Sequence, residues 1–226
     1  MTIHVLVEGA SEYALLERWA PRLVGSGNVR VHPHQGKGEL PDDLAAPPEP
    51  KRRGLLDQLP AKLRGFANTA HPQAHQVVVL VDADTDDPET LTALIAEAAA
   101  RVAPLLSVTV RLAVEETEAF YLGDQRAVMK AFPDADMAKI RAYVPDSIVG
   151  TWELFGAIVQ DGGGNKVAWA EAMGPVLTTR AGDSRSPSFK ELVRRLLTLA
   201  QAAPTKPARK RYRHPRKTTR KPDRRR

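Results

Sequence analysis

Several kinds of residue that define whole classes of protein are missing or scarce in this chain. None of its 226 residues is cysteine, which excludes disulfide frameworks, cysteine-ligated zinc, iron–sulfur clusters and thiol nucleophiles. Only 5% of the residues are aromatic, so stacking of bases on aromatic rings is not its main means of binding nucleic acid. No run approaches the roughly 18 apolar residues of a membrane span, and no basic leader precedes the first apolar stretch. These absences predict a cytoplasmic protein with no membrane contact.

Positive charge is abundant, but it is concentrated at one end of the chain. Residues 204–226 contain 12 Lys and Arg and one acid, Asp223, which gives this segment a net charge of +11. Residues 1–203 hold the other 21 bases and 26 acids and carry a net charge of −5. The basic segment has almost no apolar residues, so we expect a disordered tail that binds the phosphate backbone of nucleic acid or, alternatively, only improves solubility. Its candidate nucleic-acid contacts are Arg209, Lys210, Arg211, Arg213, Arg216 and Lys217.

Apolar runs alternate with helical periodicity over the first half of the chain. The pattern predicts strands at residues 2–8, 29–34, 76–82 and 108–114, and helices at residues 12–24, 55–67 and 88–103. Strands separated by helices of this length are typical of an α/β fold with a mostly parallel, Rossmann-like sheet flanked by helices. After Glu115 we expect helices only, the last of them at residues 187–201, and Ser11 is a candidate cap for the first helix.

Acidic residues follow three of the four predicted strands. In chain order they are Glu8, Glu12, Asp82, Asp84, Glu116 and Glu118, with Glu115 as the runner-up in the last segment. Ligands collect at the carboxyl ends of parallel strands, where like charges repel unless a proton or a cation intervenes. Oxygen ligands are those that Mg²⁺ and Mn²⁺ prefer, so the pattern favours a divalent-metal site. The alternative is that each acid is a solvated strand end or a helix cap.

Two segments with their strand–turn–helix context resemble a known fold. Val7–Glu12 and Val81–Asp84 are similar to the motifs of the Toprim fold, which topoisomerases, primases and OLD-family nucleases share. Together with Gly36–Gly38, Glu116–Asp124 and Ser186–Lys190, they resemble the DUF4276 group of bacterial Toprim-like proteins. The resemblance implies a Toprim-like metal-binding domain at residues 1–124, a helical extension packed on it at residues 125–203, and the tail at 204–226.

The resemblance also implies residue roles. In Toprim enzymes the residues that match Glu8, Asp82 and Asp84 surround Mg²⁺, and in OLD-like nucleases an acid at the position of Glu12 joins them. Glu116 and Glu118 are the candidates for a second metal position, by a looser match. The implied activity is metal-dependent phosphodiester hydrolysis, in which Glu8 and Asp82 are catalytic.

Other polar residues have two interpretations each. Lys37, between two glycines, is either a catalytic residue that stabilises charge on the phosphate or an ordinary loop lysine. His32 and His34 lie on one face of a predicted strand and either bind phosphate or metal or are half-buried edge histidines. Residues 184–189, with Arg185, either contact phosphate or cap the last helix.

The sequence therefore supports two functional hypotheses. The first is a metal-dependent nuclease of DNA or RNA, acting in bacterial anti-phage defence or mobile-element control. OLD enzymes carry an ATPase in the same chain, and this chain has no nucleotide-binding P-loop, so the resemblance implies a separate ATPase as partner. The second is a non-catalytic subunit that binds nucleic acid or assembles such a system.

Overall fold

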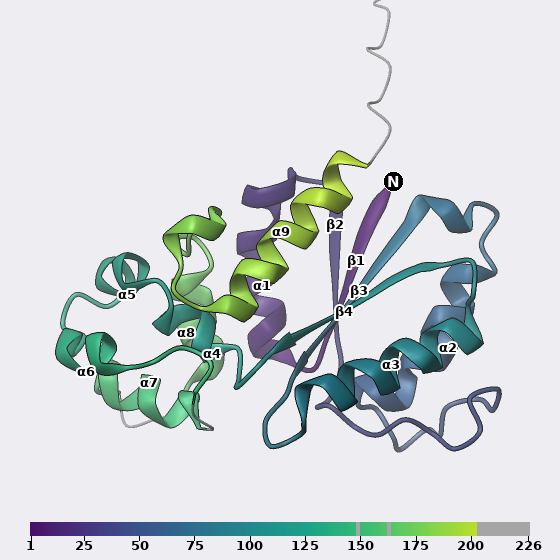
Figure 1. Cartoon of the computed structure of the whole chain (residues 1–226), viewed down its shortest axis with the longest axis horizontal. Coiled ribbons are helices and arrows are strands. Elements are labelled where there is room, and N and C mark those ends of the chain that lie inside the picture. Colours follow the sequence, from purple (N-terminus) through teal and green to yellow (C-terminus); the bar gives the residue numbers. More distant parts are fainter. Residues whose placement is uncertain (148–149, 162–163, 203–226) are drawn as a thin grey trace, which may run out of the picture.

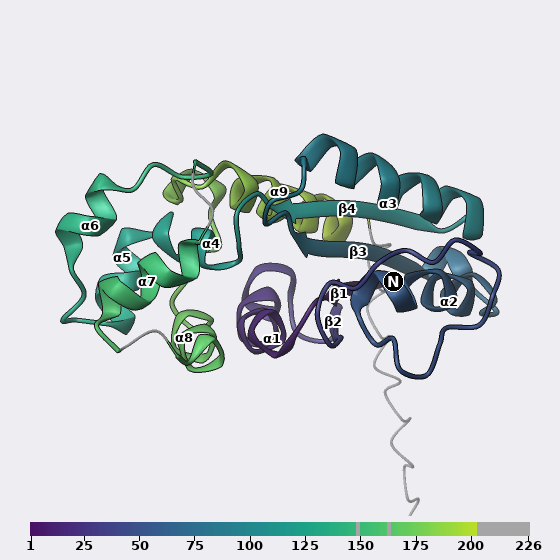
Figure 2. The same ribbon diagram turned by 90° about the horizontal axis from the view of Figure 1, so that it is seen from below.

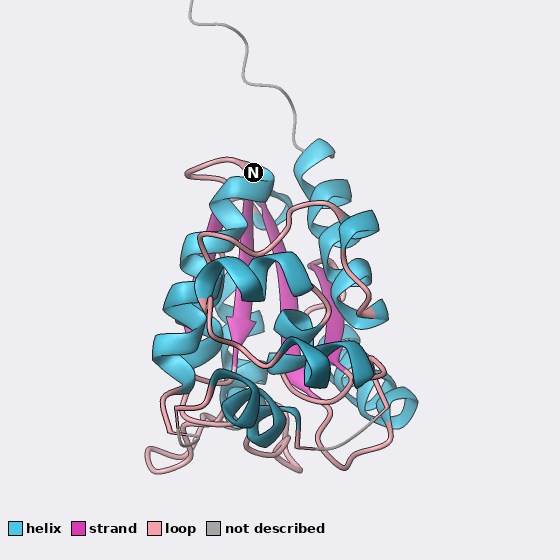
Figure 3. Cartoon of the chain, turned by 90° about the vertical axis from the view of Figure 1, so that its left-hand side faces the viewer, coloured by secondary structure: helices cyan, strands magenta, loops and turns pink. Residues whose placement is uncertain are grey.

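The chain folds around a four-stranded parallel sheet. The structure is a computed structural model, and it describes residues 1–147, 150–161 and 164–202. The strands lie in the order β2-β1-β3-β4, and every neighbouring pair is parallel (Figures 1 and 3). The strands are β1 (Thr2–Val7), β2 (Val29–Pro33), β3 (His75–Asp82) and β4 (Ser107–Ala113). The predicted α/β class and the four predicted strands are confirmed, and the sheet is parallel throughout.

Helices cover both faces of the sheet. Helices α1 (Ala10–Val24) and α9 (Pro187–Gln201) lie against one face, and α2 (Leu55–Ala67) and α3 (Pro88–Val102) lie against the other (Figure 2). Shorter helices form a further layer beyond α1 (Figure 1). They are α4 (Glu118–Leu122), α5 (Gln125–Ala131), α6 (Met137–Ala142), α7 (Thr151–Val159) and α8 (Lys166–Met173), and two 3-10 turns lie at Pro72–Ala74 and Ala181–Asp183.

The apolar run of β3 explains why the sheet is covered on both sides. Side chains alternate along a strand, so Val77, Val79 and Val81 face α2 and α3, whereas Val78 and Leu80 face α1 and α9. The second of these cores continues without a break into the short helices and includes Trp169 and Phe155. The helical part after residue 124 therefore shares its core with the sheet.

The ends of α9 bring two distant parts of the molecule into relation. Ser186, which caps the helix by accepting a hydrogen bond from the Phe189 amide at 3.2 Å, lies near the carboxyl ends of the strands. The helix then runs back along the sheet, and its last turn lies at the end where β1 begins (Figure 1). Asp87 caps α3 in the same way, at 2.9 Å from the Thr90 amide. In the described part of the chain, no helix is both long and apolar enough to cross a membrane.

Candidate metal centre at the carboxyl edge of the sheet

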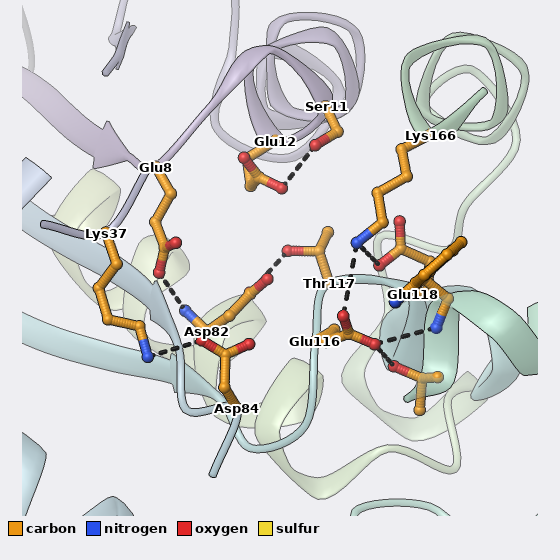
Figure 4. Close-up of polar contacts among 12 residues, drawn as sticks. Glu8, Ser11, Glu12, Lys37, Asp82, Asp84, Glu116, Thr117, Glu118 and Lys166 are labelled. Carbon is orange, nitrogen blue, oxygen red and sulfur yellow. Dashed lines mark hydrogen bonds and ion pairs between the residues drawn. The ribbon is translucent and has the colours of Figure 1, made fainter. Parts of the chain in front are cut away.

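Parallel strands β1, β3 and β4 all end at one edge, and six acids lie there. Because residues that follow parallel strands share that edge, Glu8 after β1, Asp82 at the end of β3 and Glu118 after β4 are brought together. We call the group the acidic cluster (Figure 4). Its members are Glu8, Glu12, Asp82, Asp84, Glu116 and Glu118, the six acids predicted from the sequence.

Asp82 lies at the centre of the acidic cluster. Its backbone amide donates a hydrogen bond to Glu8 Oε1 at 2.8 Å, and the Thr117 hydroxyl donates one to Asp82 Oδ1 at 3.1 Å. Burial raises the pKa of Asp82 well above its ordinary value, and repulsion from Glu12, Glu8 and Glu118 raises it further. The Asp82 carboxylate is therefore close enough to be repelled by acids from the end of β1, from α1 and from α4.

Two further carboxyls resist ionisation for the same reasons. Burial, with a contribution from Glu12, raises the pKa of Glu8 to about 7, although the Asp82 amide and Lys37 oppose the shift. Burial raises the pKa of Glu118 to about 7, against the attraction of Lys166. Glu118 is only 2% exposed. At neutral pH these carboxyls are therefore either partly protonated or ionised at an energetic cost, unless a cation neutralises them.

Glu12 and Tyr121 border the same charges. Glu12 lies in the first turn of α1, is buried, and accepts a hydrogen bond from Ser11 at 2.8 Å. Ser11 does not cap α1 as predicted, because the helix begins after Gly9 and the Ser11 hydroxyl is directed to Glu12. The Tyr121 hydroxyl is buried with no hydrogen-bond partner in residues 1–147, 150–161 and 164–202. Burial, and then repulsion from Glu118 and Glu12, raises the Tyr121 pKa well above 10.

Lys37 occupies one side of the acidic cluster. Its ammonium lies 2.7 Å from Asp84 Oδ2 and 2.9 Å from Asp86 Oδ2. Burial lowers the pKa of Lys37, but these two hydrogen-bonded acids outweigh it and raise the value overall. The flanking glycines allow this approach, since Gly36 and Gly38 have φ of 90° and 65° and a Cβ on Gly38 would lie 2.3 Å from Asp57. Lys37 is thus directed to the acids rather than into solvent.

Lys166, at the start of α8, occupies the other side. Its ammonium lies 3.4 Å from Glu116 Oε1, 4.0 Å from Glu118 Oε2, and 5.1 Å from the centre of the Trp152 ring. Glu116 also accepts hydrogen bonds from the Trp152 amide at 3.0 Å and the Thr151 hydroxyl at 3.1 Å. Sequence reasoning missed Lys166, because it follows a glycine-rich stretch without the spacing of any phosphate-binding motif, and only packing of α8 against α1 places it here.

The acids are not arranged as a ready metal site. Among the described residues, no three His, Asp or Glu side chains form a group that could hold a metal ion as they stand. The physical reason is that lysines and hydrogen-bond donors already engage several of the oxygens: Lys37 holds Asp84, Lys166 holds Glu116, and the Asp82 amide holds Glu8. Binding an ion would require these side chains to turn.

The donor set nevertheless suits a hard divalent cation. It consists of carboxylate oxygens, and three of its carboxyls have pKa values raised by burial and mutual repulsion. Beside them, the buried Tyr121 hydroxyl has no hydrogen-bond partner in the part of the chain that the structure describes. Glu8, Glu12, Asp82 and Glu118 repel one another most directly. These four are the residues that would hold an ion, while Asp84 and Glu116 would first have to leave their lysines.

Several other candidate residues have structural roles. Glu115 turns away from the acidic cluster and accepts a hydrogen bond from the Tyr143 hydroxyl. Arg185 donates to the carbonyls of Ile140 and Tyr143, at 3.3 and 2.7 Å, and Ser186 caps α9, which agrees with the interpretation of this segment as a helix cap.

The histidines also have partners within the fold. The His34 ring donates to the Val7 carbonyl at 2.7 Å, and His32 is hydrogen-bonded to His4 at 3.0 Å. His4 in turn contacts His75 at 3.0 Å. These contacts agree with the interpretation of His32 and His34 as half-buried structural residues. The six candidate bases between residues 209 and 217 lie outside the described residues.

Comparisons with protein-family models, with curated proteins and with solved structures found no match for this chain.

Proposed function

We propose that the chain is a Toprim-like nuclease that uses Mg²⁺ or Mn²⁺ to hydrolyse phosphodiester bonds in DNA or RNA. One observation carries the proposal: Glu8, Glu12, Asp82 and Glu118, from the ends of two strands and the first turns of two helices, converge and repel one another. Maintaining several acids that repel one another in partial or full burial costs stability, and such an arrangement is typical of functional sites. The resemblance of Val7–Glu12 and Val81–Asp84 to Toprim motifs agrees with this interpretation.

The residues of the chain have distinct parts in this chemistry. Divalent ions held by the acids would activate a water and stabilise the leaving oxygen of an in-line displacement. Lys37 and Lys166 lie on opposite sides of the acids, so each is placed to attract the non-bridging oxygens of a phosphate once its carboxylate partner turns to an ion. Thr117 holds the orientation of Asp82 through its hydroxyl.

Cleavage of single- and double-stranded DNA and of RNA, with Mg²⁺, Mn²⁺ or EDTA, tests the proposal. We expect metal-dependent cleavage that falls by at least about a hundredfold in Glu8→Gln and Asp82→Asn. Asp134→Asn changes an exposed acid elsewhere and should cleave as the wild type does. The proposal fails if no nucleic acid is cut, alone or with an ATPase encoded nearby, and if the Glu8 and Asp82 variants bind Mn²⁺ as the wild type does.

A specific observation favours the second candidate, a non-catalytic nucleic-acid-binding or assembly subunit. Lys37 and Lys166 already neutralise part of the acidic cluster, as expected if its charges only stabilise the fold. Deletion of residues 204–226 separates the two functions. A nuclease should lose affinity for nucleic acid but retain metal-dependent turnover, whereas a subunit that binds through the basic segment should lose its function entirely.

The cellular role of the nuclease rests on the family resemblance. We place it in bacterial anti-phage defence or mobile-element control, with a separate ATPase as partner. Co-purification of an ATPase encoded beside it, together with loss of phage restriction in Asp82→Asn, would support this role. Unchanged restriction in that variant would contradict it.

A further inference from the structure

Two arginines lie beside each other at the open edge of the sheet. β4 is an edge strand that pairs with β3, and α3 and α9 lie on either side of it (Figure 2). A groove of about 370 Å³ follows β4 from Leu106 to Arg111. Alanines of α3 form one wall of the groove. Arg111 of β4 and Arg195 of α9 supply its positive charge.

Among the described residues, neither guanidinium group is held by an acid. In residues 1–147, 150–161 and 164–202, no acid forms an ion pair with Arg111 or Arg195. Arg195 donates from Nε and Nη2 to the Thr109 hydroxyl, at 2.9 and 2.6 Å. Arg111 donates to the Val110 carbonyl at 2.8 Å, and its buried Nε has no hydrogen-bond partner in the same part of the chain. Glu191, which attracts Arg111, is itself paired with Arg194.

Two adjacent guanidinium groups in partial burial are costly without an anion. Burial lowers the pKa of Arg111, and the charge of Arg195 lowers it further. An oxyanion between the two side chains would remove the repulsion and supply an acceptor for the unpartnered donor. Guanidinium forks match the geometry of phosphate oxygens, and such charge-assisted hydrogen bonds are about twice as strong as neutral ones.

We infer that the groove along β4 binds a phosphate group of the nucleic-acid strand on which the acidic cluster acts, an inference that rests on the proposed function. The acidic cluster at the carboxyl edge of the same sheet, to which the proposed function assigns phosphodiester chemistry, favours a nucleic-acid phosphate over the carboxylate of a partner peptide. Arg111 precedes Ala113, where β4 ends at the carboxyl edge, by two residues, or roughly 7 Å of strand. At about 3.4 Å per nucleotide in a duplex strand, this distance corresponds to about two nucleotides. Residues 1–203 carry a net charge of −5, so a strand needs a local positive site to approach.

The test follows the arginine side chains themselves, because the basic residues 204–226 would dominate any bulk measurement of affinity. The Nε–H resonances of Arg111 and Arg195 are monitored by NMR in the full-length protein, in EDTA so that no cleavage occurs. The protein is titrated with inorganic phosphate, with a short thymidine oligonucleotide, and with an acidic strand-forming peptide. We expect saturable shifts of both resonances with phosphate and tighter saturation with the oligonucleotide.

Variants assign the binding to the two side chains. Arg111→Gln and Arg195→Gln should each weaken the local response of the remaining arginine by at least about tenfold. Arg195→Lys, which retains the charge but loses the fork, should have an intermediate effect. Arg126→Gln changes an exposed arginine of α5 that does not line the groove, and it should leave the response unchanged. If the Gln variants do not fold, the wild-type resonances decide alone.

The outcomes separate this inference from the proposed function. The inference is overturned if the two resonances do not shift with phosphate or oligonucleotide, or if they shift only with the acidic peptide. The nuclease proposal is unaffected by either result. Saturable phosphate binding in a protein that cleaves nothing would instead support the site and contradict the nuclease.

Discussion

Neutralising Glu118 should make the protein more stable. The pKa of about 7 for this buried carboxyl, against about 4.5 in the unfolded chain, means that the folded protein binds the proton more tightly. Its contribution to stability is present below pH 4.5 and is lost as the pH rises through 7. The shift of about 2.5 units corresponds to about 3 kcal/mol. Glu118→Gln should therefore gain about 2 to 3 kcal/mol over the wild type at pH 8, and less than about 1 kcal/mol at pH 5.

Glu116→Gln, two residues away, is the matched control with the opposite sign. Glu116 accepts hydrogen bonds from the Trp152 amide and the Thr151 hydroxyl, and its charge faces Lys166. Loss of that charge should destabilise the protein by about 1 to 2 kcal/mol at pH 8. Urea denaturation in EDTA, followed by tryptophan fluorescence, measures both variants. The reasoning is refuted if Glu118→Gln is no more stable than the wild type at pH 8, or if its gain does not depend on pH.

Three further predictions concern the rest of the fold. Burial and the neighbouring histidines lower the pKa of His4 to about 4. Its contribution to stability is therefore full above pH 6.5 and falls by about 2 kcal/mol between pH 7 and pH 5. Urea denaturation should show a smaller loss in His4→Gln and an unchanged loss in the exposed control His71→Gln. MnCl₂ should raise the melting temperature of the wild type but not of Asp82→Asn, and equal shifts in calorimetry would exclude Asp82 as a ligand. Asp87→Ala removes the cap of α3 and should lower the midpoint of urea denaturation, while an unchanged midpoint would show that the cap contributes nothing.

The four strands were accessible from the sequence because their signals are local. The residues between Gln76 and Asp82 are apolar without interruption, which is typical of a strand that is covered on both faces. The structure places this run in β3, between β1 and β4. Acids after parallel strands must share one edge, so the convergence of Glu8, Asp82 and Glu118 followed from the fold class alone. The Toprim assignment is a finer statement and stays a proposal.

The remaining features depend on tertiary packing. Which of the acids after β4 faces the acidic cluster is decided by a turn and by the Tyr143 hydroxyl, which holds Glu115 away from it. Lys166 reaches the acids only because α8 packs against α1. In that contact Arg18 of α1 pairs with Glu171 of α8, which lies 153 residues later in the chain. The chain of His32, His4 and His75 arises from three strands in register, and no single segment carries its signal.

Because α9 returns along the sheet, both described ends of the chain lie at the end of the molecule opposite the carboxyl edge of the strands. Met1 and the last turn of α9 lie at the same end, and the acidic cluster lies at the other (Figure 1). A protein attached to a surface or bead through its N-terminus would therefore present the carboxyl edge to the solution. Attachment there suits single-molecule observation of nucleic acid at the acidic cluster, since the anchor and the site are separated by the length of the strands.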